Sequence, residues 1–232
     1  MEERWPERID VGDTVRNHNE EEHRARYLWA TERITGRILD VACGTGHGSK
    51  LVAERCEVVG VDRDAGAVAM AQIRVPDGSF RVATLPPIPF DDGHFDAAVS
   101  FETLEHIEDD REFVAELRRV VKRGGRLLIS SPNRAATSPN LVPPPNPYHV
   151  REYLLPELVE LMREGGFPEV EVWHQRRERK WVVEHVAAAV IARIPRLCIP
   201  GRWWDRLGHG TGDVERWEPN IRWPSMWVLV CR

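Results

Sequence analysis

A glycine-rich segment, DVACGTGHG, occupies residues 40–48 and follows a short apolar run. Glycines at such a turn let a ligand approach the backbone closely, and we expect exposed backbone amides to point toward that ligand. The spacing is GxGxG rather than the GxGxxG that holds a dinucleotide pyrophosphate. Asp40 stands at the end of the apolar run, where its carboxylate would repel a pyrophosphate and attract a cation. The segment therefore predicts a strand, a ligand-binding turn and a helix, and it favours a cationic ligand.

Most of the chain alternates β-branched apolar runs with segments of helical periodicity. We expect strands at residues 37–42, 57–62, 79–83, 97–101, 126–130, 170–174 and 226–231. We expect helices at residues 19–34, 49–55, 64–73, 109–122, 155–165 and 181–194. Gly124 and Gly125 are expected to end the fourth of these helices. This alternation predicts an α/β protein with a Rossmann-like, doubly wound and mostly parallel sheet of seven strands.

Two segments are expected to lack regular structure. Residues 132–149 are rich in proline, and residues 200–224 are rich in tryptophan and glycine. Long irregular loops in compact domains are usually functional. We therefore expect these segments to cover the ligand site.

The composition excludes several classes of protein. The chain has 232 residues, enough for one domain with a substantial core, and its net charge of -5 argues against a protein that coats nucleic acid. It contains no apolar run long enough to span a membrane, and its charged N-terminus does not resemble a secretory signal. The four cysteines lack CxxC spacing, which is typical of reduced thiols in the cytoplasm. We therefore expect a cytoplasmic protein without a membrane span.

A second acidic residue, Asp62, closes the second expected strand. A carboxylate at this position of a doubly wound sheet can accept hydrogen bonds from both hydroxyls of a ribose. Together with the glycine-rich turn, Asp62 predicts a nucleoside ligand spread over the carboxyl edge of the sheet.

Four segments resemble the successive motifs of class I S-adenosylmethionine (SAM)-dependent methyltransferases. They are RILDVACGTGHGS, VVGVD, LPPIPFDDGHFDAAVSFETLEHI and LRRVVKRGGRLLISSPN. The similar subgroup contains small-molecule enzymes, including ubiquinone-biosynthesis O-methyltransferases and methyltransferases of glycan and antibiotic pathways. The segments EHRARYLWA and NPYHVREY resemble the glycan and antibiotic kind. The resemblance implies that the last strand, residues 226–231, inserts antiparallel into the sheet.

The resemblance also implies a role for each residue around the cofactor. The methionine half of SAM would contact the turn, at Asp40, Ala42, Cys43, Gly44 and Gly46, and Arg26 or Tyr27 would close over its carboxylate. Asp62 would bind the ribose, Arg63, Thr84 and Leu85 would line the adenine, and Phe101 and Glu102 would lie under the sulfonium. Many family members carry a Gly-Asp pair where this chain has Ala83-Thr84. The adenine would then rely on backbone groups and a hydroxyl.

Two histidines are candidate catalytic bases. Methyl transfer to a hydroxyl is assisted by a base, and histidine is the usual one near neutral pH. His106 follows the fourth expected strand, and His149 lies in the loop expected to cover the acceptor. We favour His149, because this loop varies with the acceptor in the fold class. We expect no metal to take part.

The expected activity is SAM-dependent methylation of a small molecule, with a sugar or natural-product hydroxyl as acceptor and S-adenosylhomocysteine as product. An amino sugar or another small amine is the alternative acceptor. An NAD-dependent oxidoreductase and a non-catalytic SAM-binding protein are alternatives of other classes. We expect a small-molecule partner and no nucleic acid, and a homodimer is compatible with the sequence.

The chain is expected to form a single domain with four parts. Residues 1–35 form an N-terminal helical cover, residues 36–131 the SAM-binding core, residues 132–224 the acceptor lid and insert, and residues 225–232 the closing strand. Residues 171–206 are locally basic, which is typical of a solvated face; alternatively, Arg176, Arg177 and Arg179 could hold a phosphate on the acceptor. The tryptophans of the insert are interpreted as packing residues of the core and lid: Trp181, Trp203, Trp204, Trp217 and Trp223.

Overall fold

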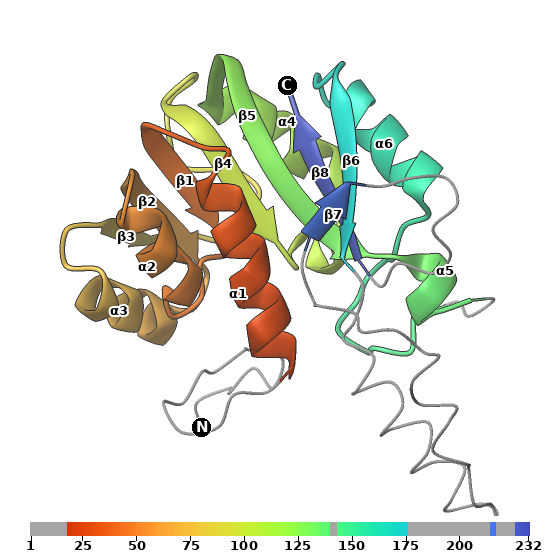
Figure 1. Ribbon diagram of the computed structural model, residues 1–232, viewed down its shortest axis with the longest axis horizontal. Coiled ribbons are helices and arrows are strands. Elements are labelled where there is room, and N and C mark those ends of the chain that lie inside the picture. The colour runs from red at the N-terminus through yellow and green to blue at the C-terminus, as the bar shows by residue number, and fades with distance from the viewer. Residues whose placement is uncertain (1–17, 140–142, 176–213, 217–225) are drawn as a thin grey trace, which may run out of the picture.

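The computed structural model describes residues 18–139, 143–175, 214–216 and 226–232. These residues form one sheet in the strand order β3-β2-β1-β4-β5-β8-β6-β7 (Figure 1). The strands are β1 (Arg37–Val41), β2 (Glu57–Asp62), β3 (Ser79–Val82), β4 (Phe95–Phe101), β5 (Val121–Pro132), β6 (Val170–Gln175), β7 (Val214–Arg216) and β8 (Met226–Cys231). The helices are α1 (His18–Thr31), α2 (His47–Ala53), α3 (Ala65–Arg74), η1 (Leu104–His106, a 3-10 turn), α4 (Asp110–Val120), α5 (Arg134–Thr137) and α6 (Leu155–Glu164).

The direction of the strands places the carboxyl ends of the central strands at one edge of the sheet. Strands β1 to β5 pair in parallel, and β8 inserts antiparallel between β5 and β6. The strand order reverses between β1 and β4, and in doubly wound sheets ligands commonly bind beyond the carboxyl ends at such a point. In Figure 1 this edge lies at the bottom, near the start of α1 and near α5.

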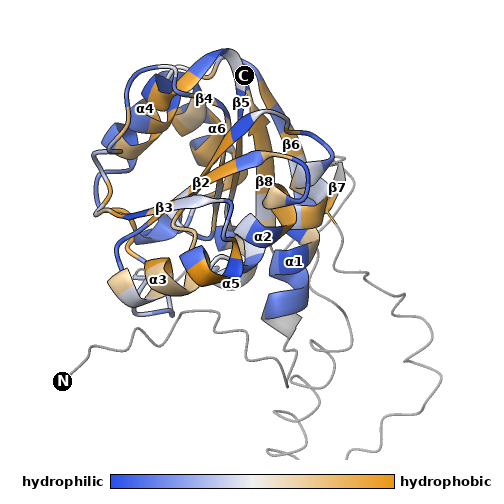
Figure 2. Cartoon of the chain, turned by 90° about the vertical axis from the view of Figure 1, so that its left-hand side faces the viewer, coloured by the Kyte–Doolittle hydropathy of each residue, from blue (hydrophilic) through white to orange (hydrophobic). Residues whose placement is uncertain are grey.

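Helices cover both faces of the sheet because successive strand residues point to opposite sides. In β1, Ile38 packs in a cluster with residues of α1 and α2, whereas its neighbour Leu39 packs in a cluster with residues of α4 and α6. Both side chains are fully buried. Figure 2 shows hydrophobic residues concentrated on the strands, with hydrophilic residues on the outer side of α1. Because both faces of the sheet are covered, most strand residues are apolar, which explains the continuous apolar runs in the sequence.

The predicted fold class is confirmed: the sheet is doubly wound, mostly parallel, and closed by the antiparallel strand β8. The seven expected strands are all present. The described residues add one short strand, β7, which pairs with the end of β6 inside a segment predicted to be irregular. β7 is a strand because its backbone pairs with β6, and such long-range pairing cannot be predicted from the local composition.

Two local predictions were wrong. Gly124 and Gly125 do not end α4: the helix stops at Val120, and β5 starts at once because Val121 pairs with Phe95 of β4. The register then shifts before regular pairing resumes, and Gly124 (φ 77°) takes the left-handed conformation within this irregular stretch. The proline-rich loop also contains the short helix α5, capped by the Asn133 side chain. The helix expected at 181–194 lies outside the described residues.

Candidate active site

The glycine-rich turn after β1 combines three left-handed residues, Ala42 (φ 57°), Gly44 (φ 53°) and Gly46 (φ 78°). A Cβ atom placed on Gly46 would lie 2.9 Å from the Cα of Ala71, so this glycine lets the turn pack against α3. A Cβ atom placed on Gly44 would meet no heavy atom within 4 Å. Gly44 therefore leaves open space on the side of the turn where a ligand is expected.

Three backbone amides of the turn are already bonded within the protein. The amide of Gly44 donates to Asp62 Oδ2 at 2.8 Å, and that of Gly46 donates to the Cys43 carbonyl at 3.0 Å. The amide of Cys43 donates to the Val61 carbonyl at 3.0 Å. The prediction that exposed amides of these glycines point toward a ligand was therefore wrong. The parallel pairing of β1 with β2 brings the end of β2 beside the turn, and its acceptors take the amides of Cys43 and Gly44, while the Gly46 amide is bonded within the turn.

Asp40 lies beneath the turn rather than at its surface. Its carboxylate is fully buried and accepts hydrogen bonds from the Tyr27 hydroxyl at 2.7 Å and the Ser49 hydroxyl at 2.5 Å. Burial raises the pKa of Asp40 to about 6, although the two hydroxyl donors act in the opposite direction. Asp40 is therefore a buried carboxyl group under the turn, held by hydroxyls of α1 and α2.

Tyr27 joins α1 to the turn. Its ring occupies the place of a side chain at Gly48, where an added Cβ would lie 2.1 Å from Tyr27 Cζ, and it contacts the edge of Phe101 at a centroid distance of 5.1 Å. Both aromatic side chains are buried. Tyr27 and Phe101 therefore support the site from below, with the Tyr27 hydroxyl committed to Asp40.

Asp62 links the turn to the end of β2. Besides the Gly44 amide, its carboxylate accepts the Asp64 amide through Oδ1 at 2.9 Å. Each carboxylate oxygen has two lone pairs, so each oxygen keeps capacity for a further donor. Arg63 and Thr84 are exposed and Leu85 is half-buried. They follow β2 and β3, which pair up to Asp62, so they lie at the same edge of the sheet.

Arg26 brings a buried positive charge to the site from α1. Its side chain is 3% exposed; Nη1 donates to Gln175 Oε1 at 2.5 Å, and Nη2 lies 3.7 Å from Glu102 Oε1. Its Nε is buried and has no hydrogen-bond partner among the described residues. Because a buried donor without a partner costs free energy, this guanidinium is suited to receive an anionic group.

Glu102 follows β4 in a left-handed conformation (φ 54°), which is uncommon for a residue with a side chain. Its Oε1 accepts the Ser130 hydroxyl at 3.0 Å, and its side chain is 27% exposed. Such strain is maintained at functional sites where the surrounding structure enforces it. Glu102 therefore presents a carboxylate at the carboxyl end of β4, opposite Arg26.

The two candidate histidines meet beyond β4, with ring centroids 5.0 Å apart. His106 belongs to η1, and its Nδ1 lies 3.0 Å from the Tyr148 carbonyl. His149 Nδ1 lies 2.7 Å from Glu152 Oε1, and its Nε2 lies 2.9 Å from Asn146 Nδ2. Burial favours a raised pKa for Glu152, but the Ser138, Thr137 and His149 contacts outweigh it and lower the pKa. The ionised Glu152 therefore orients His149.

Several residues of the candidate site were not predicted from the sequence. Gln175 and Glu152 were not predicted because they take part in the site only by contacting Arg26 and His149, respectively. Glu105, directly before His106, is buried, and burial together with the nearby charge of Glu102 raises its pKa well above the usual range. A signal for Glu105 was present: it lies three residues after Glu102, just beyond a strand that ends at the carboxyl edge.

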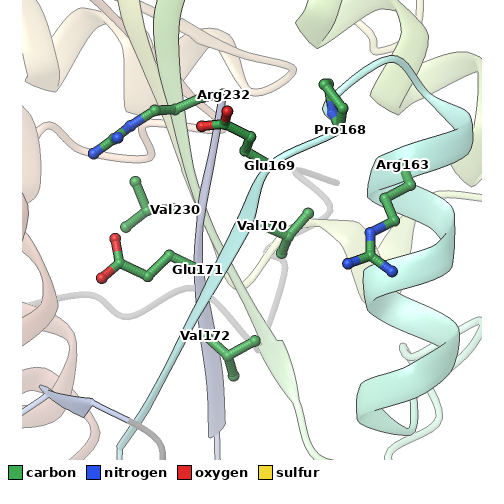
Figure 3. A pocket seen from close by; sticks show the side chains of 8 residues that line it. All are labelled: Arg163, Pro168, Glu169, Val170, Glu171, Val172, Val230 and Arg232. Carbon is green, nitrogen blue, oxygen red and sulfur yellow. The ribbon is translucent and has the colours of Figure 1, made fainter.

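A separate open cavity of about 480 Å³ lies at the amino-terminal half of β6 (Figure 3). Figure 3 shows Arg163 of α6 on one side of β6, and Glu171 and Arg232 on the other. Val170 at the start of β6 pairs with Cys231 of β8, and Cys231 pairs in turn with Leu127 of β5. Leu127 lies close to Arg126, where β5 begins its regular pairing with β4. The cavity is therefore at the opposite end of the sheet from Asp62 and Glu102, and it does not belong to the site described above.

Comparisons with known proteins agree with this geometry. A family model described as a methyltransferase domain matches residues 39–129. A probable S-adenosylmethionine-dependent methyltransferase of Mycolicibacterium smegmatis is 34% identical over 207 residues, which cover 87% of this chain and 80% of the relative. The chain belongs to the SAM-dependent methyltransferases. The enzyme is therefore a transferase, and its family implies SAM as the methyl donor.

Two further comparisons concern shorter matches or the fold alone. The methyltransferase is 33% identical over 105 residues to a ubiquinone/menaquinone biosynthesis C-methyltransferase of Citrifermentans bemidjiense, covering 41% of this chain and 45% of that protein. The crystal structure of a SAM-dependent methyltransferase from Archaeoglobus fulgidus superposes with a TM-score of 0.60 at 18% identity, covering 93% and 94% of the two chains. The first match supports the resemblance to ubiquinone-pathway methyltransferases, but the matched relative is a C-methyltransferase rather than one of the expected O-methyltransferases. The second match supports the fold.

The residues of the methyltransferase fit SAM on observations of this structure. The space at Gly44 admits a ligand, the unpartnered Nε of Arg26 suits a carboxylate, and Asp62 keeps acceptor capacity for hydroxyls. Glu102 adds negative charge beside the turn, as a sulfonium requires. Among the described helices, none is both long and apolar enough to traverse a lipid bilayer. The arginines and tryptophans singled out in the insert lie outside the described residues: Arg176, Arg177, Arg179, Trp181, Trp203, Trp204, Trp217 and Trp223.

Proposed function

We propose that this methyltransferase methylates a hydroxyl oxygen of a small molecule, with a sugar or natural-product hydroxyl as the first candidate acceptor. The observation that carries the proposal is the pairing of His149 with the buried carboxylate of Glu152 at 2.7 Å. If His149 Nδ1–H donates to Glu152, as this contact favours, the lone pair of His149 lies on Nε2, where the acceptor hydroxyl would replace the contact with Asn146 Nδ2 at 2.9 Å. A base held in this way suits the removal of a proton from a hydroxyl.

The cofactor-binding roles follow from the positions of the residues. Arg26, kept in place by Gln175, would bind the methionine carboxylate, and Asp62 would bind the ribose. The adenine would lie along three residues after β2 and β3, namely Arg63, Thr84 and Leu85. Ala42, Cys43, Gly44 and Gly46 would shape the backbone surface against the methionine half. SAM when bound supplies an electrophilic methyl group on a positively charged sulfur.

Other residues act through these contacts. Asp40 and Tyr27 would hold the turn in position from below, while Phe101 fixes the end of β4 against α1. Glu102 would face the sulfonium side of the cofactor. His106 is a second candidate to contact the acceptor, because its ring lies against that of His149. The core at residues 36–131 would thus bind SAM, and residues 1–35 and 132–224 would cover the acceptor.

The cofactor part of the proposal is tested by calorimetry on the purified chain. We expect SAM and S-adenosylhomocysteine to bind, NADH not to bind, and Asp62→Ala to weaken both SAM and S-adenosylhomocysteine at least tenfold, about 1.4 kcal/mol. Asp77→Ala, an exposed aspartate after α3, is the matched control and keeps the wild-type affinity. Equal affinity of wild type and Asp62→Ala would exclude Asp62 from the cofactor site.

The acceptor part is tested with SAM carrying a 13C-labelled methyl group. We expect His149→Ala to lower turnover by roughly 100-fold, the usual scale for loss of a general base, and to keep SAM affinity. The chemical shift of the transferred methyl carbon distinguishes products methylated at oxygen, nitrogen or carbon. A carbon-methylated product would instead support the activity named for the Citrifermentans relative. Full turnover by His149→Ala would remove this residue from the reaction.

A further inference from the structure

Glu105, His106 and His149 form a cluster of three side chains with metal-ligating atoms. One ligand atom from each residue lies within 4.8 Å of the others. Two ligands bound to one ion at about 2.1 Å can lie up to about 4.2 Å apart, so side-chain movements of less than ~1 Å would bring the three atoms onto one ion. The cluster is assembled from two segments, because the amides of Val150 and Arg151 donate to the Glu105 carbonyl at 2.7 and 3.3 Å.

Both histidines have the contacts that metal ligands usually have on the far side of the ring. A ligating histidine donates its other ring N–H to a carbonyl or a carboxylate, which fixes the tautomer. His106 Nδ1 contacts the Tyr148 carbonyl, and His149 Nδ1 contacts the Glu152 carboxylate. Both contacts favour a lone pair on Nε2. In His149 this nitrogen lies 2.9 Å from Asn146 Nδ2, a contact that a bound ion would replace.

Glu105 supplies an independent indication. Its side chain is 1% exposed, and its Oε2 has no hydrogen-bond partner among the described residues. The carboxylate of Glu102 is near enough to repel it. The charge of Arg26 and the Ser131 hydroxyl offset part of the cost of burying this carboxyl group, and a coordinated cation would offset more of it.

We propose that Glu105, His106 and His149 bind one divalent cation at the acceptor side of the cofactor site. Two imidazoles and one carboxylate favour a first-row transition ion such as Mn²⁺ or Zn²⁺ over Mg²⁺, which prefers oxygen ligands. Three protein ligands leave positions open, as in catalytic metal sites. The cluster departs from the expectation, drawn from the sequence, that no metal takes part.

The site gives the proposed methyl transfer a second means of activating the acceptor, and to that extent it rests on the proposed function. A divalent cation lowers the pKa of a hydroxyl that binds to it. In the metal-bound form, His149 Nε2 would be a ligand and the hydroxyl proton would pass to water. In the metal-free form, His149 would remain the base of the proposed function. The oxygen–methyl bond forms as the sulfur–methyl bond breaks, and neutral S-adenosylhomocysteine leaves.

The test is a calorimetric titration of the chelator-treated full chain with MnCl₂ and with ZnCl₂. We expect one ion per chain, and we expect Glu105→Gln and His106→Gln to bind it at least tenfold more weakly. Glu105→Gln is expected to fold, because it removes a charge that burial and Glu102 oppose. His94→Gln is the matched control: this half-buried histidine stacks on Phe90 outside the cluster and keeps the wild-type affinity.

Each outcome decides the question. No bound ion in the wild type, or equal affinity in wild type, Glu105→Gln and His106→Gln, overturns the metal site. Titration of the same samples with S-adenosylhomocysteine separates the two proposals. If that ligand binds while the metals do not, only the metal site fails. If S-adenosylhomocysteine does not bind, the proposed function fails whatever the metals do.

Discussion

The space at Gly44 leads to a prediction that compares two glycines of the same conformation. Gly44 (φ 53°) and Gly124 (φ 77°) are both left-handed, and an added Cβ meets no heavy atom within 4 Å at either position. Alanine in this conformation costs about 1–2 kcal/mol. Gly44→Ala and Gly124→Ala should therefore lose similar stability, equivalent to a fall in Tm of roughly 2–8 °C for a chain of this size.

The two variants should differ in cofactor binding. The methyl group of Gly44→Ala would occupy the open side of the turn, where the methionine half of SAM is proposed to lie. Gly124 lies elsewhere, in the irregular first part of β5. We expect calorimetry to show at least a tenfold loss of S-adenosylhomocysteine affinity in Gly44→Ala, about 1.4 kcal/mol, and no loss in Gly124→Ala. Equal affinities in the two variants would refute the reasoning, because the space at Gly44 would then lie outside the cofactor site.

Three further predictions concern the residues around the turn. Gly46→Ala should lower Tm more than Gly44→Ala in a thermal melt, since its Cβ would lie 2.9 Å from the Cα of Ala71; an equal fall would contradict the packing role. Burial raises the pKa of Asp40 from 3.8 to about 6, so the folded state binds more protons between these values and this residue's contribution to stability falls as pH rises through them. The free energy of unfolding of Asp40→Asn, measured in urea relative to that of the wild type, should therefore rise by up to about 3 kcal/mol between pH 3 and pH 7. The other titrating groups cancel in this difference. A difference that stays constant with pH would contradict the raised pKa of Asp40. Arg26→Met should weaken S-adenosylhomocysteine binding at least tenfold but leave 5′-methylthioadenosine, which lacks the amino-acid carboxylate, unaffected; equal losses for the two ligands would argue against the carboxylate contact.

The sequence by itself determined the features that depend on local periodicity and local chemistry. The apolar runs around Asp40 and Asp62 indicated parallel strands, and the boundaries of β2 and β8 were predicted to the residue. The GxGxG spacing located the turn, because left-handed backbone at Gly44 and Gly46 favours glycine. Since parallel strands end at a common edge, these local signals were sufficient to predict a candidate site at that edge.

Only the tertiary structure decided which groups meet. Arg26 contacts Gln175, 149 positions away, and His106 meets His149 because the loop after β5 returns to η1. The strand pairing also brought Asp62 against the Gly44 amide, which reversed the expected role of that amide. Contacts of this kind depend on long-range packing, because a donor bonds the acceptor that the folded chain brings within about 3 Å, and sequence spacing does not record that distance.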